Sequence, residues 1–197
     1  MTIAATPREG WRVVDIVVAA VLAVAFGVVF QAWNLLWEGA KPAFVALPPL
    51  QGFMYGVWLL PAVLVPLVVR RPGAAVLGEV IAASVSALLG AQWGLLTVVY
   101  GVMQGGAAEL VFAFTLYRAW NLPVALLAGA SAGAAAVLLD LSLFYPEWAA
   151  GWQLAYAALV IPSAALVAGL GSWLLVRALA RTGVLGPFPS GRAQPEV

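Results

Sequence analysis

Six long apolar runs constrain this chain more than any other feature of its sequence. They cover about residues 13–33, 52–69, 74–90, 95–117, 124–144 and 154–179. A helix needs about 20 residues to cross the hydrocarbon core of a bilayer, and a helix satisfies its own backbone hydrogen bonds in lipid. The runs lack the alternating ~10-residue pattern of membrane β-strands. The sequence therefore predicts an all-α integral membrane protein with six transmembrane helices.

The charged residues are too few for a water-facing surface and are unevenly distributed. They make up 9% of the 197 residues, whereas soluble domains have about 25%. Basic residues favour the cytoplasmic side of a membrane. With the N-terminus inside, only Lys41 lies outside, and the arginines lie inside: Arg8, Arg12, Arg70, Arg71, Arg118, Arg177, Arg181 and Arg192. We expect a multi-pass protein of the cell membrane with both termini cytoplasmic.

The connections between the runs are short, with one exception. Residues 37–51 include the Pro48–Pro49 pair, which excludes a regular α-helix and indicates an external loop. No internal repeat is evident, so we expect one membrane domain over residues 1–185. Residues 186–197 are rich in Pro and Gly and are expected to form a disordered cytoplasmic tail.

The missing residue types limit the chemistry of this chain. It contains no cysteine and no histidine, so it lacks thiolate and imidazole metal ligands and the usual general base near neutral pH. It has no glycine-rich phosphate loop of the kind that hydrolyses ATP. The net charge of +1 does not favour nucleic acid. We expect neither an enzyme nor a bound cofactor or metal.

Three acids lie inside the apolar runs, where ionisable groups are costly and usually functional. Glu79 and Glu109 lie toward the inner ends of the third and fourth helices, and Asp140 lies near the outer end of the fifth. Glu79 and Glu109 could instead pair with an arginine or a buried amide and only lock helices together. Asp140 could equally be a solvated acid at a helix end.

A polar and aromatic stripe follows the fourth helix. Trp93, Tyr100 and Gln104 are spaced by seven and four residues, which places them on one helical face. Stacking rings with hydrogen-bonding groups suit a flat heteroaromatic ligand. With the acids and the outer aromatics, the candidate substrate-binding residues are Glu109, Gln104, Tyr100, Trp93, Gln92, Asp140, Trp148 and Trp37.

Small residues form a second stripe, on the first helix. Ala19, Ala23 and Gly27 are each four residues apart, and small residues allow membrane helices to approach closely. The partner helix could belong to this chain or to another protein, and the spacing alone does not decide between them.

Several of these segments resemble one family. They are Trp11 and Asp15, residues 71–74 (RPGA), residues 90–94 (GAQWG) and, most specifically, residues 104–112 (QGGAAELVF). The chain resembles the YkoE-type substrate-binding (S) component of energy-coupling factor (ECF) transporters. Members of this family were once labelled cobalt permeases, a label that the missing histidines argue against.

The resemblance implies a capture protein for thiamine or its hydroxymethylpyrimidine precursor, with the ligand site on the outer side under the first loop. It also implies a transmembrane coupling protein and two cytoplasmic ATPases as partners, with Ala19, Ala23 and Gly27 facing the coupling protein. Two alternatives remain open at this point. One is an ion-coupled secondary transporter that uses Glu79 and Glu109, and the other is a membrane assembly subunit without a ligand.

Overall fold

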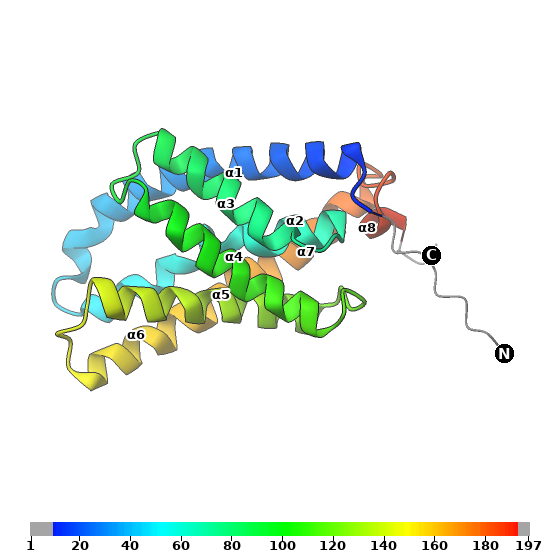
Figure 1. The fold of residues 1–197 in the computed structure, drawn as a ribbon. Helices are drawn as coiled ribbons and strands as arrows, with labels where there is room; N and C mark the ends of the chain where they lie inside the picture. Colours follow the sequence, from blue (N-terminus) through cyan, green and yellow to red (C-terminus); the bar gives the residue numbers. More distant parts are fainter. Residues whose placement is uncertain (1–9, 193–197) are drawn as a thin grey trace.

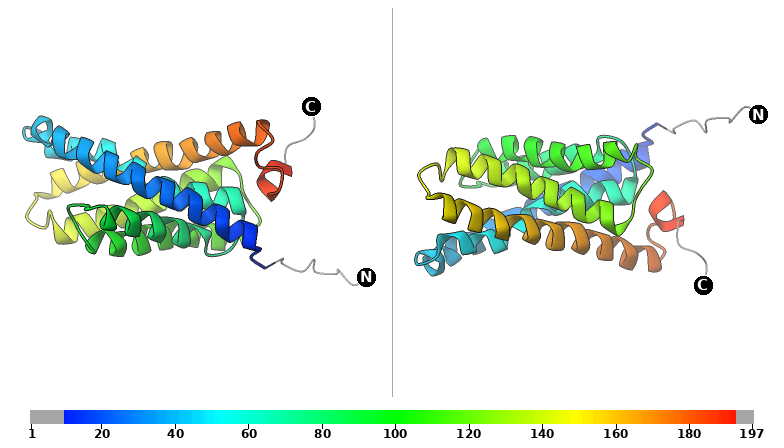
Figure 2. Two further views of the ribbon diagram at one scale, coloured as in Figure 1. Left: turned by 90° about the horizontal axis from the view of Figure 1, so that it is seen from above. Right: turned by 90° about the horizontal axis from the view of Figure 1, so that it is seen from below.

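The computed structural model describes residues 10–192, which form a bundle of six lengthwise passes (Figures 1 and 2). The described chain begins and ends at the same end of the bundle, which we call the terminal end; the opposite end is the cavity end. The passes, in chain order, are α1 (Val13–Ala40), η2 with α2 (Pro48–Leu59, Leu60–Val69), α3 (Ala74–Leu88), α4 (Leu96–Phe114), α5 (Leu122–Leu143), and α6, η3 and α7 (Ala150–Ser163, Ala164–Leu170, Gly171–Arg181).

Five of these passes are long and apolar enough to cross a membrane, and α3 is a shorter apolar helix. The prediction of six helical passes is therefore confirmed. The loop predicted over residues 37–51 is shorter than expected, because α1 continues to Ala40 and is followed by a 3₁₀ turn, η1 (Lys41–Phe44). The Pro48–Pro49 pair begins η2. Proline has no backbone N–H to donate, and at the start of a helix this N–H has no partner within the helix.

Two passes change helix type along their length. The 3₁₀ helix η2 spans 12 residues, although 3₁₀ runs longer than 3–4 residues are uncommon. It faces the π-helical segment η3, which follows Pro162. The hydroxyl of Ser163 joins the two passes, because it donates to the Phe53 carbonyl at 2.8 Å and accepts from the Gly56 N–H at 3.2 Å.

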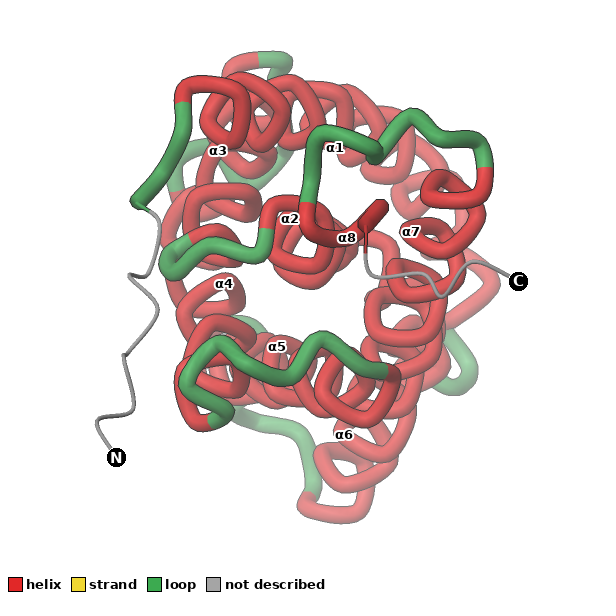
Figure 3. The backbone as a smooth tube through the Cα atoms, turned by 90° about the vertical axis from the view of Figure 1, so that its right-hand side faces the viewer, coloured by secondary structure: helices red, strands yellow, loops and turns green. Residues whose placement is uncertain are grey.

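The core of the bundle is centred on α2. Its residues from Pro61 to Val69 are all buried, and α1, α3, α4, α5 and α7 pack around it (Figure 3). A helix that is apolar on every side is stable only when it is surrounded in this way or by lipid. The pass formed by η2 and α2 therefore has a fixed place, and η2 continues it toward the cavity end.

The small-residue stripe of α1 faces the inside of this chain. Ala19 and Ala23 have no exposed surface, and a Cβ added to Gly27 would lie 2.5 Å from the Val85 Cβ on α3. The stripe thus allows the close packing of α1 on α3 and leaves no surface for a coupling protein to contact. This corrects the interface that the resemblance implied, and it settles the open choice in favour of packing within the chain.

The terminal end is closed by a network of polar contacts around the turn between α2 and α3. The buried Asp15 carboxylate accepts from Arg12 Nη2 at 2.7 Å and from Arg71 Nε at 2.8 Å. The indole of Trp11 donates to the Pro72 carbonyl at 3.0 Å. These bonds tie the beginning of α1 to the α2–α3 turn.

The segment after α7 also packs against this end. Leu185 and Phe188 are buried, and the Ser190 hydroxyl donates to the Val68 carbonyl at 2.9 Å. A short helix, α8 (Pro189–Arg192), ends the described chain. The tail predicted to be disordered over residues 186–197 is therefore ordered up to residue 192, and residues 193–197 lie outside the described residues.

Candidate functional site

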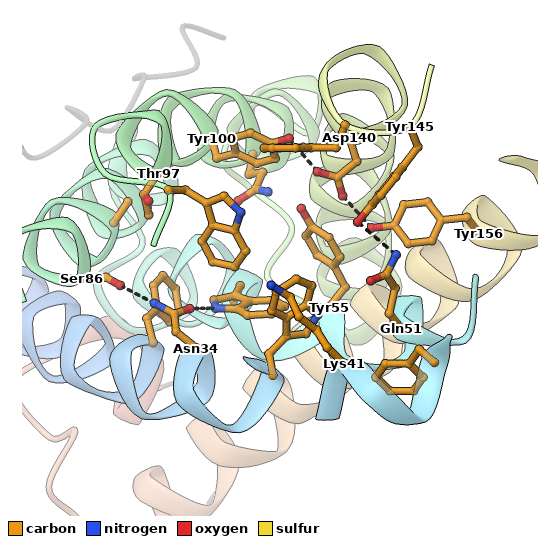
Figure 4. A pocket seen from close by; sticks show the side chains of 18 of the residues that line it. Asn34, Lys41, Gln51, Tyr55, Ser86, Thr97, Tyr100, Asp140, Tyr145 and Tyr156 are labelled. Carbon is orange, nitrogen blue, oxygen red and sulfur yellow. Dashed lines mark hydrogen bonds between the residues drawn. The ribbon is translucent and has the colours of Figure 1, made fainter. Parts of the chain in front are cut away.

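A cavity of about 560 Å³ lies between the passes toward the cavity end (Figure 4). Its walls come from α1, η1, η2, α3, α4, α5 and α6. Small-molecule sites typically have volumes of about 300–1,000 Å³ and combine aromatic walls with a few polar groups. The cavity has the size and the chemistry of such a site.

Tryptophans form one wall of the cavity around Trp58 on η2. The Trp58 ring meets Trp37 and Trp93 with centroid distances of 6.4 and 5.9 Å and meets Tyr55 at 5.6 Å. Its indole N–H donates to Asn34 Oδ1 at 2.8 Å, which fixes the ring edge. This wall offers flat apolar faces on which an aromatic ligand can stack.

Asp140 and several tyrosines form another part of the cavity wall. The hydroxyl of Tyr100 donates to Asp140 Oδ1 and that of Tyr156 to Asp140 Oδ2, both at 2.6 Å. Asp140 is 6% exposed, and no ion pair involving it is found within residues 10–192. The helices α4, α5 and α6 thus hold a buried carboxyl beside the cavity. Within the described residues no cationic side chain pairs with it.

Tyr145 and Trp148 continue this wall beyond the end of α5. Their rings are stacked with centroids 4.1 Å apart, and Gln51 Nε2 donates to the Tyr145 hydroxyl at 3.0 Å. Burial and the nearby Asp140 raise the pKa of Tyr145 above its ordinary value. The phenol therefore keeps its proton at neutral pH and can donate a hydrogen bond into the cavity.

Polar groups with few or no partners line the part of the cavity formed by α3 and α4. Glu79 is 1% exposed, and its Oε2 accepts from the Ala62 N–H at 2.9 Å. Gln104 is 4% exposed and also lines the cavity. The hydroxyl oxygen of Thr97 is buried and has no hydrogen-bond partner among residues 10–192. Buried polar atoms are rarely left unpaired, so the Thr97 hydroxyl indicates a polar ligand, and Glu79 and Gln104 offer further polar groups beside it.

The structure brings six of the eight predicted substrate-binding residues to this one cavity. They are Trp37, Trp93, Tyr100, Gln104, Asp140 and Trp148. Gln92 is exposed in the turn before α4 and does not line the cavity.

Glu109 also lies outside the cavity, and its surroundings explain why. It is one turn beyond Gly105 toward the terminal end of α4. Its two oxygens accept from the backbone N–H groups of Gly73 at 2.6 Å and Ala75 at 2.8 Å, which are free at the beginning of a helix. Glu109 therefore caps α3 instead of facing a ligand, and it pairs with backbone where an arginine or an amide was the expected alternative.

Several cavity residues were not among the predicted ones: Asn34, Gln51, Tyr55, Trp58, Glu79, Ser86, Thr97 and Tyr156. Trp58 carried a usable signal, because it interrupts an apolar run about 9 Å from the outer end of that run, deeper than an aromatic belt explains. Asn34 lay just beyond the expected end of the first helix. Glu79 was recognised as a costly acid but was not assigned to the ligand site.

The fold and this site together define a class: a polytopic membrane protein with a binding cavity for a small molecule. Residues 14–135 match a family described as the permease component of an ABC-type cobalt transport system. YkoE of Bacillus subtilis (strain 168), described as a candidate HMP/thiamine permease protein, is 34% identical over 187 residues, which cover 93% of this chain and 92% of the relative.

A solved structure extends this likeness to three dimensions. The crystal structure of an S component of an ECF transporter matches with a TM-score of 0.88 and 34% identity, covering 93% of this chain and 92% of that one. The chain belongs to the YkoE-type family of ECF-transporter S components, a family of multi-pass plasma-membrane proteins. Within residues 10–192 no group of three or more His, Cys, Asp or Glu side chains is placed to hold a metal ion.

Proposed function

We propose that this protein captures thiamine or its hydroxymethylpyrimidine precursor in the 560 Å³ cavity. The observation that carries the proposal is the Asp140 carboxyl, which two phenols hold beside an aromatic wall. Thiamine joins a permanently charged thiazolium to a flat aminopyrimidine. A carboxylate and aromatic faces attract the cation, and tryptophans such as Trp58 stack on the flat rings.

The charge distribution supports an orientation for this capture. Arg12, Arg70, Arg71, Arg118 and Arg181 lie at the ends of passes on the terminal end, whereas Lys41 lies at the cavity end. By the positive-inside tendency, the terminal end faces the cytoplasm and the cavity opens to the outside. The protein would then take its ligand from the exterior.

The energy for uptake has to come from partners. The sequence has no ATP-binding loop of its own, and membership of the S-component family supports docking on an ECF module. We propose that this module consists of a transmembrane coupling protein and two cytoplasmic ATPases. The ion-coupled alternative is weakened, because Glu109 uses both of its oxygens to cap α3.

Ligand-induced stabilisation of the purified protein in detergent tests this proposal. A ligand that binds only the folded state stabilises it by about 2.7 kcal/mol at a concentration of 100 times its Kd. Thiamine or hydroxymethylpyrimidine should therefore raise the melting temperature, and riboflavin should leave it unchanged. If neither compound produced a shift at millimolar concentration, the proposed function would be wrong.

A further inference from the structure

We propose that Glu79 determines which ligands this site accepts: with Gln104, it recognises the aminopyrimidine edge at a subsite separate from Asp140. This inference rests on the proposed function. It concerns an acid that the capture of a cation does not require.

The first observation is that Glu79 is buried and only partly satisfied. It lines the cavity, it is 1% exposed, and Oε2 accepts from Ala62 N–H. Within residues 10–192 no second hydrogen bond is found for the Glu79 carboxyl, and none is found for the Gln104 side chain. A carboxyl has about four acceptor positions, so the single bond to Ala62 leaves capacity for a ligand.

The second observation is that the backbone fixes where these two side chains lie. A Cβ added to Gly105 would lie 3.0 Å from the Glu79 Cβ, and one added to Gly101 would lie 3.2 Å from the Glu79 carbonyl oxygen. The two glycines therefore let α4 pack closely on α3 at this level. Gln104, between them in sequence, comes from α4 to the same region of the cavity as Glu79 from α3.

The third observation is that Asp140 on α5 and Glu79 on α3 contact α4 at different levels. The Tyr100 hydroxyl of α4 donates to Asp140, and Gly105 of α4 packs against the Glu79 side chain. Five residues of α-helix rise about 7.5 Å, so the two acids are held at different depths of one cavity. That separation suits a ligand of two small rings joined by one carbon, with its cationic ring at Asp140.

The chemistry of the second ring matches Glu79 and Gln104. An aminopyrimidine presents an exocyclic amine, which is a donor, beside a ring nitrogen, which is an acceptor. Glu79 Oε1 can accept from the amine, and Gln104 Nε2 can donate to the ring nitrogen. Leaving buried polar partners unpaired is costly, so an analogue without this donor–acceptor pattern should bind poorly.

Calorimetry with thiamine and oxythiamine tests this assignment, because oxythiamine carries an oxo acceptor in place of the amine. The parent protein should prefer thiamine by about tenfold or more. Glu79→Gln should weaken thiamine binding by about ten- to hundredfold and reduce or reverse the preference, because its new amide can donate to the oxo group. An equal loss for both compounds, together with a lower melting temperature, would show that Glu79 only locks the fold.

The chain offers a matched control and a second variant. Glu109→Gln makes the same change at an acid that also accepts backbone N–H groups but lies outside the cavity, and it should leave both affinities unchanged. Gln104→Leu keeps the bond between Glu79 and Ala62 and serves if Glu79→Gln fails to fold. It should weaken thiamine and hydroxymethylpyrimidine to a similar extent, and unchanged affinity for both would contradict the assignment.

Two failures can be told apart in these titrations. If the parent bound none of the compounds, the proposed function would fail and this inference with it. If the parent bound thiamine but Glu79→Gln kept the same ratio of thiamine to oxythiamine affinity, only the role of Glu79 would be overturned.

Discussion

The two ends of this bundle treat their buried acids in opposite ways. At the terminal end, Asp15 pairs with Arg12 and Arg71, and Glu109 caps α3 with both oxygens. At the cavity end, Asp140 is held only by phenols, and Glu79 has one backbone donor. The acids of both ends have partners within the chain, but at the cavity end Asp140 has only neutral phenols and Glu79 only one backbone N–H.

This difference distinguishes the acids that stabilise the fold from the acids that are available to a ligand. An acid whose charge is balanced by arginines, or whose oxygens cap a helix away from the cavity, stabilises the fold. An acid without a cation beside an aromatic cavity is positioned to receive one. Variants at the terminal end should therefore change mainly the stability, and variants at the cavity end should change mainly the ligand affinity.

The largest effect on stability is expected for Arg71→Met at the terminal end. Removing one member of a buried ion pair typically costs about 3–5 kcal/mol, and Asp15 has no exposed surface. The melting temperature of the ligand-free protein should fall clearly, while the thiamine affinity of the folded fraction stays unchanged. Arg118 is exposed, so Arg118→Met is the control and should change neither the melting temperature nor the thiamine affinity. A large loss of thiamine affinity in Arg71→Met would contradict the distinction between the two ends.

Asp140→Asn at the cavity end should have the largest effect on binding. Losing a charge-assisted contact costs about 1.5–3 kcal/mol, so thiamine affinity should fall by about ten- to hundredfold. The uncharged hydroxymethylpyrimidine should lose much less, because it brings no cation to this carboxyl. Calorimetry with both compounds measures the two losses, and equal losses would mean that Asp140 does not face the cation.

The sequence identified the acids Asp140 and Glu109 with unequal success. The six passes were predictable, because the bilayer sets the length and composition of a spanning helix. Asp140 was also found, since it lies near Trp148 and Tyr145 in the sequence. Glu109 was assigned to the ligand because the helical period gives the face of a residue but not its depth relative to a cavity.

Other features depend on packing between distant segments. Trp58 enters the cavity because η2 is a 3₁₀ helix stacked on α6 and η3, and local sequence favoured a loop over part of that region. The burial of Ala19 and Ala23 likewise depends on where α3 packs. A stripe of small residues predicts a close contact but not the identity of the partner.

Trp58→Leu should have a moderate effect that is shared by both ligands. Aromatic contacts contribute about 0.5–1.5 kcal/mol beyond burial, so thiamine and hydroxymethylpyrimidine should each lose about three- to tenfold. Trp173→Leu removes a tryptophan that pairs with Arg177 outside the cavity and is the matched control. A loss confined to thiamine would indicate that Trp58 contacts only the cationic ring.

The smallest effect is expected for Glu109→Gln. A negative charge at the beginning of a helix contributes about 0.3–1 kcal/mol, and glutamine can still accept one of the two backbone hydrogen bonds. A small decrease in melting temperature with unchanged thiamine affinity is the expected result. A tenfold loss of thiamine affinity would return Glu109 to the ligand site and remove the contrast between the two ends.

A crystal structure of this protein with thiamine would show where each ring of the ligand binds, because the thiazolium ring contains a sulfur atom. The chain contains three methionines and no cysteine, so anomalous scattering should reveal the thiazolium sulfur as a peak that no protein residue explains. We predict this peak inside the cavity, nearer to Asp140 than to Glu79, with the aminopyrimidine next to Glu79 and Gln104. A ligand bound elsewhere, or bound in the cavity with its sulfur next to Glu79, would contradict this account of the site.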